Sequence, residues 1–176
     1  MKYLRAMNGE KSHASGYMFK INEVNISEIW NENATTPEEQ GGFNFTNEEN
    51  ILRWIIRGDT IYDVVIPEDA TIVKINNINT PNGVYRTNKI IVKNPQKITD
   101  NLCLEYLKVS KMPQKTYFQV LAILAGKGFA KTCLEIISSK INKNNINDCI
   151  SEYLNFSFYK NNGIYNTILD KLYKIQ

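Results

Sequence analysis

The chain has few of the side chains from which reaction centres and metal sites are usually built. Its 176 residues include a single histidine, His13, and only three cysteines, Cys103, Cys133 and Cys149. No Cys-x-x-Cys pair occurs, so a zinc site would lack ligands, and a Ser-His-Asp or Cys-His arrangement would have to use His13. Neither a P-loop nor a Gly-x-Gly-x-x-Gly pattern is present. The sequence therefore favours a protein with no catalytic residue, no metal and three reduced core cysteines.

Long apolar segments are also missing. The longest apolar run, residues 120–125, is far shorter than the roughly 20 residues that span a bilayer. The first residues, MKYLRAMNGEKSH, lack the apolar region of a signal peptide. We therefore expect no membrane partner and a reducing, cytoplasmic compartment, in which cysteines stay unpaired.

The net charge of +3 is small, but the charges are unevenly distributed. Residues 1–98 carry a net charge of −1 and residues 99–176 a net charge of +4. The basic residues of the second part are all lysines, whereas all four arginines, Arg5, Arg53, Arg57 and Arg86, belong to the first part. Because arginine is suited to bidentate recognition of carboxylate or phosphate, a specific anion site is expected in the first part.

The first part, residues 1–98, is expected to form strands around one helix. Short segments with strand-like composition occupy residues 2–7, 16–21, 60–66 and 71–75, and a longer one occupies residues 84–93, ending at Asn94-Pro95. The polar segment 22–40 reads as a loop with one helical turn at 26–30. Thr46-Asn47-Glu48-Glu49 has the pattern of a capping box, in which the Thr46 hydroxyl would accept from the backbone of Glu49. An apolar face follows, so we expect a helix over 47–57 that ends at Gly58.

The second part, residues 99–176, is expected to form about five short helices. Thr99 is placed to cap the first helix, Pro113 suits the first turn of the second, and Asn144 or Asn145 can cap the fourth. Strands followed by helices are typical of the α+β class. We therefore expect a small, mostly antiparallel sheet with one packed helix in residues 1–98. A C-terminal helical bundle in residues 99–176 is expected to share one core with it.

Lysines recur at the ends of the predicted helices, among them Lys111, Lys115, Lys127 and Lys131. If these ends lie on one side of the bundle, the lysines form a basic patch for a macromolecular partner or for the backbone of nucleic acid. A solvated surface, with lysines facing the helix macrodipoles, explains the same pattern without a partner.

Three N-terminal segments carry a resemblance to a known family. Arg5 lies on the first expected strand, YLRAM, the segment GGFNFT at 41–46 precedes the predicted helix, and paired strands follow. In this order they resemble ADP-ribosyltransferase-like domains. The resemblance implies that Arg5 grips a phosphate of NAD and that Thr46 lines the nicotinamide pocket, and Arg86 is a third candidate for ligand binding. The family's catalytic Glu has no counterpart in residues 84–93.

The chain as a whole resembles uncharacterised proteins of phages and low-GC bacteria, through the segments GGFNFT, RGDTIYDV and YRTNKIIVKNP. Our leading hypothesis is a non-enzymatic interaction protein of phage or mobile-element type that binds another protein, an inhibitor of a host defence nuclease being one specific version. Two alternatives stay open. One is an NAD-binding, ADP-ribosyltransferase-like enzyme, and the other is a nucleic-acid-binding module that uses the lysine-rich helix ends.

Overall fold

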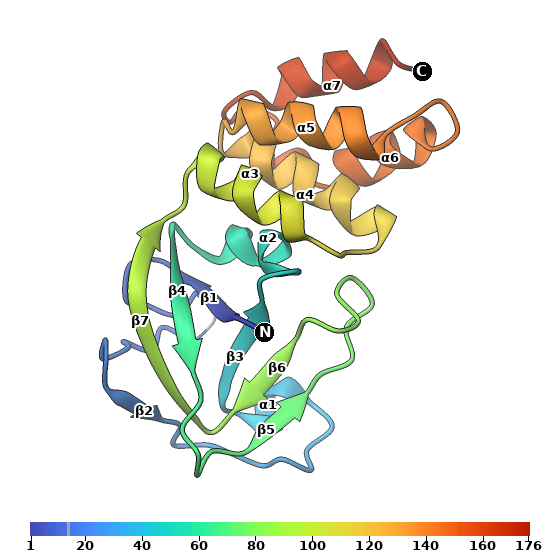
Figure 1. The fold of residues 1–176 in the computed structure, drawn as a ribbon. Helices are drawn as coiled ribbons and strands as arrows, with labels where there is room; N and C mark the ends of the chain where they lie inside the picture. The colour runs from blue at the N-terminus through green and yellow to red at the C-terminus, as the bar shows by residue number, and fades with distance from the viewer. Residues whose placement is uncertain (14) are drawn as a thin grey trace. The chain divides into compact units, whose positions relative to one another are not determined.

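A seven-stranded antiparallel sheet forms the first of two units into which the chain divides, unit 1 (Met1–Ile98) and unit 2 (Thr99–Gln176). The computed structural model describes residues 1–13 and 15–176, except for the side chains of residues 37 and 38. All the strands belong to unit 1, and most of the helical residues belong to unit 2 (Figure 1). The expected α+β class is confirmed.

The strands of unit 1 are ordered β2-β7-β4-β1-β3-β6-β5 across the sheet, and each neighbouring pair is antiparallel. Their bounds are Tyr3–Met7 for β1, Val24–Ile26 for β2, Phe43–Asn47 for β3, Thr60–Val65 for β4, Ile72–Lys74 for β5, Tyr85–Thr87 for β6 and Lys89–Lys97 for β7. Two short helices, α1 (Pro37–Gln40) and α2 (Ile51–Trp54), and a 3₁₀ turn, η1 (Ile55–Arg57), complete the unit. The elements α2 and η1 lie against β1.

The sheet divides between β1 and β3. These two strands pair over only two positions, Tyr3 with Asn47 and Leu4 with Thr46. Beyond Leu4, β1 stays paired with β4 as far as Met7, whereas β3 runs back along β6 as far as Phe43. Figure 1 shows the two halves, with β7, β4 and β1 on one side and β3, β6 and β5 on the other. Beyond the Leu4–Thr46 pair the two strands separate, so side chains and not backbone hydrogen bonds fill the space between them.

One face of the divided sheet carries an aromatic-rich core cluster of unit 1. The buried members of this core come from both halves and are Met7, Phe19, Phe43, Phe45, Tyr62, Val64, Ile90 and Val92. Aromatic rings dominate the contacts, with Phe19 and Phe43 at 5.2 Å and Tyr3 and Phe45 at 5.0 Å between ring centroids. Side chains alternate along a strand, so Arg5 lies on the same face of β1 as Tyr3 and Met7. A charged residue therefore occupies a position on the apolar face of the sheet.

The helix expected over 47–57 is wrong in its beginning and its length. Thr46 and Asn47 end strand β3, and the α-helix covers only Ile51–Trp54 before it tightens into the turn η1. No side chain caps this helix, and the Thr46 hydroxyl donates to the main-chain carbonyl of Gly83 instead. Thr46 and Asn47 form a strand instead of a helix start, because β3 pairs with β1 and β6 and this non-local pairing outweighs the local capping-box pattern.

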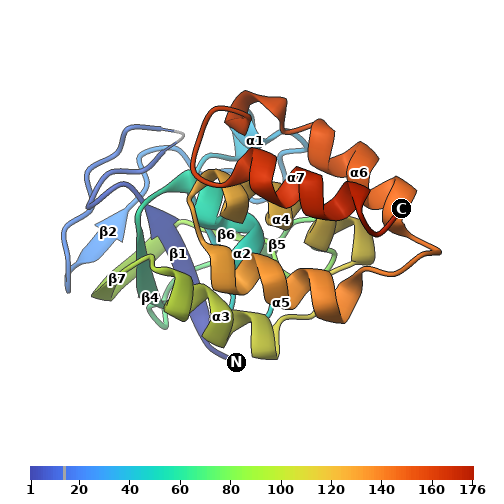
Figure 2. The same cartoon turned by 90° about the horizontal axis from the view of Figure 1, so that it is seen from above.

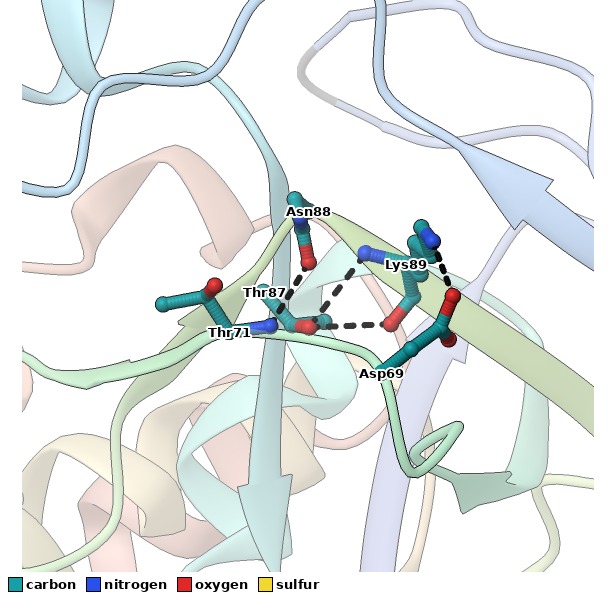
Figure 3. Close-up of polar contacts among 5 residues, drawn as sticks. All are labelled: Asp69, Thr71, Thr87, Asn88 and Lys89. Carbon is teal, nitrogen blue, oxygen red and sulfur yellow. Dashed lines mark hydrogen bonds and ion pairs between the residues drawn. The ribbon is translucent and has the colours of Figure 1, made fainter.

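The single strand expected over 84–93 is also wrong. This segment forms two strands, β6 and the first part of β7, which belong to different halves of the sheet. The chain turns at Asn88, where the Thr87 hydroxyl donates to the carbonyl of Lys89 at 2.9 Å (Figure 3). The Asn88 side chain accepts from the backbone N–H of Thr71 at 2.8 Å, and Lys89 pairs with Asp69. These bonds fix the turn between β6, which pairs with β3, and β7, which pairs with β4.

Strand β7 also continues past the expected end at Asn94-Pro95. Asn94 has a φ of 52°, and the register with β4 shifts between Ile61 and Asp63. This bulge absorbs Asn94-Pro95 within the strand. The strand expected over 16–21 and the helical turn expected at 26–30 are wrong as well. Residues 16–21 make only isolated bridges, and residues 24–26 form the edge strand β2.

Unit 2 has the five helices that the periodicity predicts, and their bounds are Asp100–Val109 for α3, Gln114–Gly126 for α4, Ala130–Lys140 for α5, Ile146–Leu154 for α6 and Tyr165–Tyr173 for α7, with a 3₁₀ turn η2 at Ser157–Tyr159. Thr99 caps α3 as expected, since its hydroxyl accepts from the backbone of Leu102. The expected side-chain cap of α6 is wrong, because the side chain of Asn145 bonds to the backbone of Lys140 and Asn142 instead. The central helix is α4, which is buried from Thr116 to Ala125 and contacts α5, α6 and α7. Figure 2 shows α3 and α5 side by side, and these two helices are in contact.

The three cysteines lie buried on α3, α5 and α6 and are unpaired, which confirms the expected core cysteines. Burial raises the pKa of Cys103 and of Cys149 to about 12 and raises that of Cys133 above its usual range. A thiol is nucleophilic only as a thiolate, so these side chains are packing residues at neutral pH.

Candidate anion-binding site

A cavity of unit 1 lies where the sheet divides, and its volume is about 410 Å³. Three arginines line it, so we call it the arginine cavity after Arg5, Arg57 and Arg86. Its other polar lining residues are Ser12, His13, Thr35, Thr36, Gln40, Asn44, Thr46 and Asn77, and its apolar ones are Leu4, Ala6, Ala34, Phe45, Trp54, Ile75 and Val84. This volume falls in the range of small-molecule sites, about 300–1,000 Å³.

The division of the sheet explains why these residues meet. Leu4 and Thr46 form the last pair between β1 and β3, and the next residues on each strand, Arg5 and Phe45, line the cavity. Arg86 reaches it from β6, where it is directly opposite Asn44. The cavity is therefore built from residues far apart in the sequence that the split brings together.

Arg5 spans the division between the two halves. Its Nη1 donates to the main-chain carbonyl of Asn44, its Nη2 donates to the Ser12 hydroxyl at 3.0 Å, and its guanidinium carbon lies 4.8 Å from the centroid of the Phe19 ring. Burial lowers the pKa of Arg5 to about 10, with a further contribution from the positive charge of Arg86. The guanidinium therefore stays charged at neutral pH in poorly solvated surroundings. Its Nε is buried and has no hydrogen-bond partner among the described residues.

Arg86 is anchored by the glycine pair before β3. Its Nη1 donates to the carbonyl of Gly41 at 2.8 Å. Gly41 has a φ of 62°, and a Cβ there would lie 2.1 Å from the carbonyl oxygen of Ile29, so only glycine fits this approach. The GGFNFT segment thus supplies both a strand of the cavity and the anchor of one of its arginines.

Trp54 and Arg57 reach the cavity from the end of α2 and from η1. The turn lies close to β1 because Gly58 allows it, since a Cβ at Gly58 would lie 2.0 Å from the carbonyl oxygen of Met7. Arg57 is exposed and has no hydrogen-bond or ion-pair partner in the described part of the chain, whereas the indole Nε1 of Trp54 is buried without an acceptor there. Indole and guanidinium nitrogens can only donate, so both Trp54 and Arg5 offer a donor that no described group accepts.

All three residues predicted from the sequence as ligand-binding, Arg5, Thr46 and Arg86, line this one cavity. The Thr46 hydroxyl is engaged by the Gly83 carbonyl. Trp54 and Arg57 were not predicted. The one available signal for Arg57 was the restriction of arginine to the first part of the chain, and nothing in the sequence marks Trp54.

The described lining residues include no Asp or Glu. Ser12 and His13 both line the cavity, but no described lining carboxylate is present to orient the histidine in a triad. Among the side chains that the structure describes, no group of three or more His, Cys, Asp or Glu residues that could hold a metal ion occurs. What the cavity offers chemically is positive charge and hydrogen-bond donors, which are suited to holding an anion.

The four lysines predicted as a patch form two groups in unit 2. Lys111 and Lys115 lie near the beginning of α4, and Lys127 and Lys131 lie near its end, about 18 Å along the helix axis from Lys115 to Lys127. Lys115 forms an ion pair with Glu152 at 2.8 Å, and the Lys131 ammonium donates to Asn101 at 3.0 Å. The structure therefore does not gather these lysines into one patch.

Comparison of the chain with models of protein families, with curated proteins and with solved structures finds no match. In the described part of the chain, no helix combines the length and the apolar character needed to cross a membrane.

Proposed function

We propose that the protein works by binding and not by catalysis, and that the arginine cavity holds an anionic group of its ligand. The observation that carries this proposal is the convergence of Arg5, Arg57 and Arg86 on a cavity with no described carboxylate in its lining. A half-buried arginine on an apolar sheet face, such as Arg5, is costly to desolvate unless a partner compensates its charge. An anion supplies that compensation. The sequence favours an interaction protein, and this proposal adds that its ligand carries an anionic group. Inhibition of a host nuclease stays a prediction.

Calorimetric titration with pyrophosphate tests the proposal. The wild-type protein is expected to bind with one site, and Arg86→Gln is expected to weaken binding by about tenfold or more, because a charge-assisted hydrogen bond is lost. Lys97→Gln is the matched control, since it removes one positive charge from unit 1 at a position outside the cavity lining. Equal weakening in both variants, or no binding to the wild type, would contradict the proposal.

A second candidate function is NAD-dependent transfer, and one observation favours it. Arg5 and Thr46, the residues to which the family resemblance assigns the NAD phosphate and the nicotinamide pocket, line the same cavity. The absence of a described lining carboxylate weighs against it, because the oxocarbenium-like transition state would lack a stabilising charge. Calorimetry with NAD and an assay for released nicotinamide decide this. The transferase is excluded if NAD gives no heat of binding and if Arg5→Ala gives the same calorimetric and nicotinamide-release results as the wild type.

A further inference from the structure

We propose that Asn162 is a site of spontaneous chemical modification, at which the side-chain amide is lost and the main chain is lengthened by one carbon atom. The inference is independent of the arginine cavity, because it concerns a turn of unit 2. Asn162 and Gly163 lie in the segment that connects the 3₁₀ turn η2 to helix α7. The sequence Asn-Gly, two polar groups without partners and the close packing of Gly163 against α4 carry the argument.

The reaction joins two neighbouring groups of the chain. The main-chain nitrogen of Gly163, having lost its proton, attacks Cγ of Asn162, so that a carbon–nitrogen bond forms. The bond from Cγ to Nδ2 breaks, and the amide leaves with a proton as ammonia. Water, the one co-reactant, then opens the resulting succinimide ring at either carbonyl group and gives aspartate or isoaspartate, with nothing oxidised or reduced. Glycine favours the ring closure because no Cβ obstructs the approach and its backbone adopts many conformations.

The hydrogen bonds of the glycine N–H groups distinguish the three Asn-Gly pairs of the chain, which are Asn8-Gly9, Asn82-Gly83 and Asn162-Gly163. The N–H of Gly9 donates to the Asp59 carboxylate at 2.9 Å, and that of Gly83 donates to the carbonyl of Thr80 at 3.0 Å. A proton held in a hydrogen bond is harder to release, so both bonds slow the attack. The N–H of Gly163 has no acceptor among the described residues.

The asparagine side chains differ in the same direction. The Oδ1 of Asn82 accepts from the Lys74 ammonium at 2.9 Å, which restrains its amide. The Asn162 side chain is exposed and forms no hydrogen bond with any group that the structure describes, so its Cγ is free to rotate toward the nitrogen of Gly163. Nucleophile and amide are therefore both free at Asn162-Gly163, and we expect this pair to react first.

The turn that isoaspartate would lengthen lies tightly against the end of α4. A Cβ at Gly163 would lie 2.4 Å from the carbonyl oxygen of Ala125, and the N–H of Ile164 donates to that same oxygen at 2.9 Å. The carbonyl of Asn162 accepts from the N–H of Tyr165 at 3.2 Å, at the beginning of α7. In isoaspartate this carbonyl becomes part of a free carboxylate, and an extra carbon separates the Asn162 Cα from Gly163. The modification is therefore expected to loosen the beginning of α7, whereas aspartate leaves the main chain unchanged.

Peptide mapping during incubation at mildly alkaline pH measures all three pairs in one sample of the native protein. A residue that has reacted carries OH in place of NH₂, and a methyltransferase specific for isoaspartate distinguishes the two products. Asn162 is expected to react about fivefold or more faster than Asn8 and Asn82, because its glycine has no hydrogen bond to give up. In protein unfolded by urea, the three rates are expected to be similar.

Two variants test the cause and the consequence. Asp59→Ala removes the acceptor of the Gly9 N–H and is expected to accelerate the reaction at Asn8 and to leave that at Asn82 unchanged. The isoaspartate form, separated by ion exchange, is expected to unfold at a lower temperature than Asn162→Asp. These two proteins have the same mass and charge and differ only in the path of the main chain.

Similar rates at the three pairs of the native protein, or a faster reaction at Asn8 or Asn82, would overturn Asn162 as the favoured site. A preference for Asn162 that persists in urea would trace the reactivity to the local sequence and contradict the role of the fold. An unchanged rate at Asn8 in Asp59→Ala contradicts protection by the hydrogen bond. Equal unfolding temperatures of the isoaspartate form and Asn162→Asp contradict the loosening of α7.

Discussion

The guanidinium of Arg5 donates a hydrogen bond to the main-chain carbonyl of Asn44, across the line where β1 and β3 stop pairing. One side chain thus takes the place that a backbone donor occupies elsewhere in the sheet. The same residue leaves its Nε without a partner in the described structure. Arg5 therefore both closes the split and presents a donor at it, so its two roles can be separated by substitution.

Arg5→Met is expected to remove anion binding and to leave the free energy of unfolding within about 1 kcal/mol of the wild type. The substitution loses the hydrogen bonds to Asn44 and Ser12 but gains an apolar side chain against Phe19, and these effects oppose each other. Urea denaturation and calorimetry with pyrophosphate measure the two quantities. A variant that unfolds readily and still binds would show that Arg5 is a structural residue.

Gly58→Ala is expected to destabilise unit 1 by roughly 1–3 kcal/mol, because the new methyl group would overlap the backbone of Met7. The substitution also moves the turn that carries Arg57, so pyrophosphate binding should weaken. Gly9→Ala is the comparison, since a Cβ at Gly9 meets nothing within 4 Å and only its φ of 53° opposes alanine. Thermal unfolding that ranks Gly9→Ala as the more damaging change would refute the close-approach argument.

The capping-box error at Thr46 and the success at Thr99 have one explanation. At Thr99 the segment that follows has no strand partner, so the local signal decides and the side chain caps α3. Thr46 has the same kind of capping pattern, but it lies on strand β3, which pairs with β1 on one side and with β6 on the other. Sequence patterns of three or four residues cannot reveal such pairing. The composition did indicate that an anion site belongs to the first part of the chain, but the split that gathers the arginines arises only from the folded sheet.

Asp100 is expected to make the stability of unit 2 depend on pH. Partial burial would raise the pKa of Asp100, but hydrogen bonds from the Thr132 side chain and from the backbone of Thr132 and Lys131 outweigh it and hold that pKa below its usual 3.8. A lowered folded-state pKa gives stabilisation that is fully present above about pH 5 and is lost as the pH falls through the folded value. Asp100→Asn should therefore lower the free energy of unfolding at pH about 7 by roughly 1–3 kcal/mol.

Denaturation curves at several pH values test this, with the exposed Asp170→Asn as control. The wild type and Asp170→Asn should both lose stability on acidification, and Asp100→Asn should lose less. Parallel pH profiles for all three proteins would contradict the role given to Asp100.

Tyr153 and Tyr165 form a reciprocal pair in unit 2, and their hydroxyls are expected to be energetically coupled. Each hydroxyl donates to the other residue's main-chain carbonyl, at 2.8 Å and 2.9 Å, and both side chains are buried. Tyr153→Phe and Tyr165→Phe should each cost about 0.5–1.5 kcal/mol, because each removes one buried hydrogen bond to a main-chain carbonyl. Tyr173→Phe, at an exposed ring, should cost nearly nothing. A double-mutant cycle by urea denaturation measures the coupling, and strict additivity would show that the two bonds act independently.

The indole resonance of Trp54 tests the central claim most directly. The protein has two tryptophans, so a ¹H–¹⁵N spectrum contains two indole N–H signals, which Trp30→Phe assigns. Titration with pyrophosphate is predicted to shift the Trp54 signal to saturation as its buried N–H acquires an acceptor, and to leave the Trp30 signal in place. A Trp54 signal that stays unmoved while pyrophosphate binds would place the anion elsewhere and contradict the arginine cavity as the binding site.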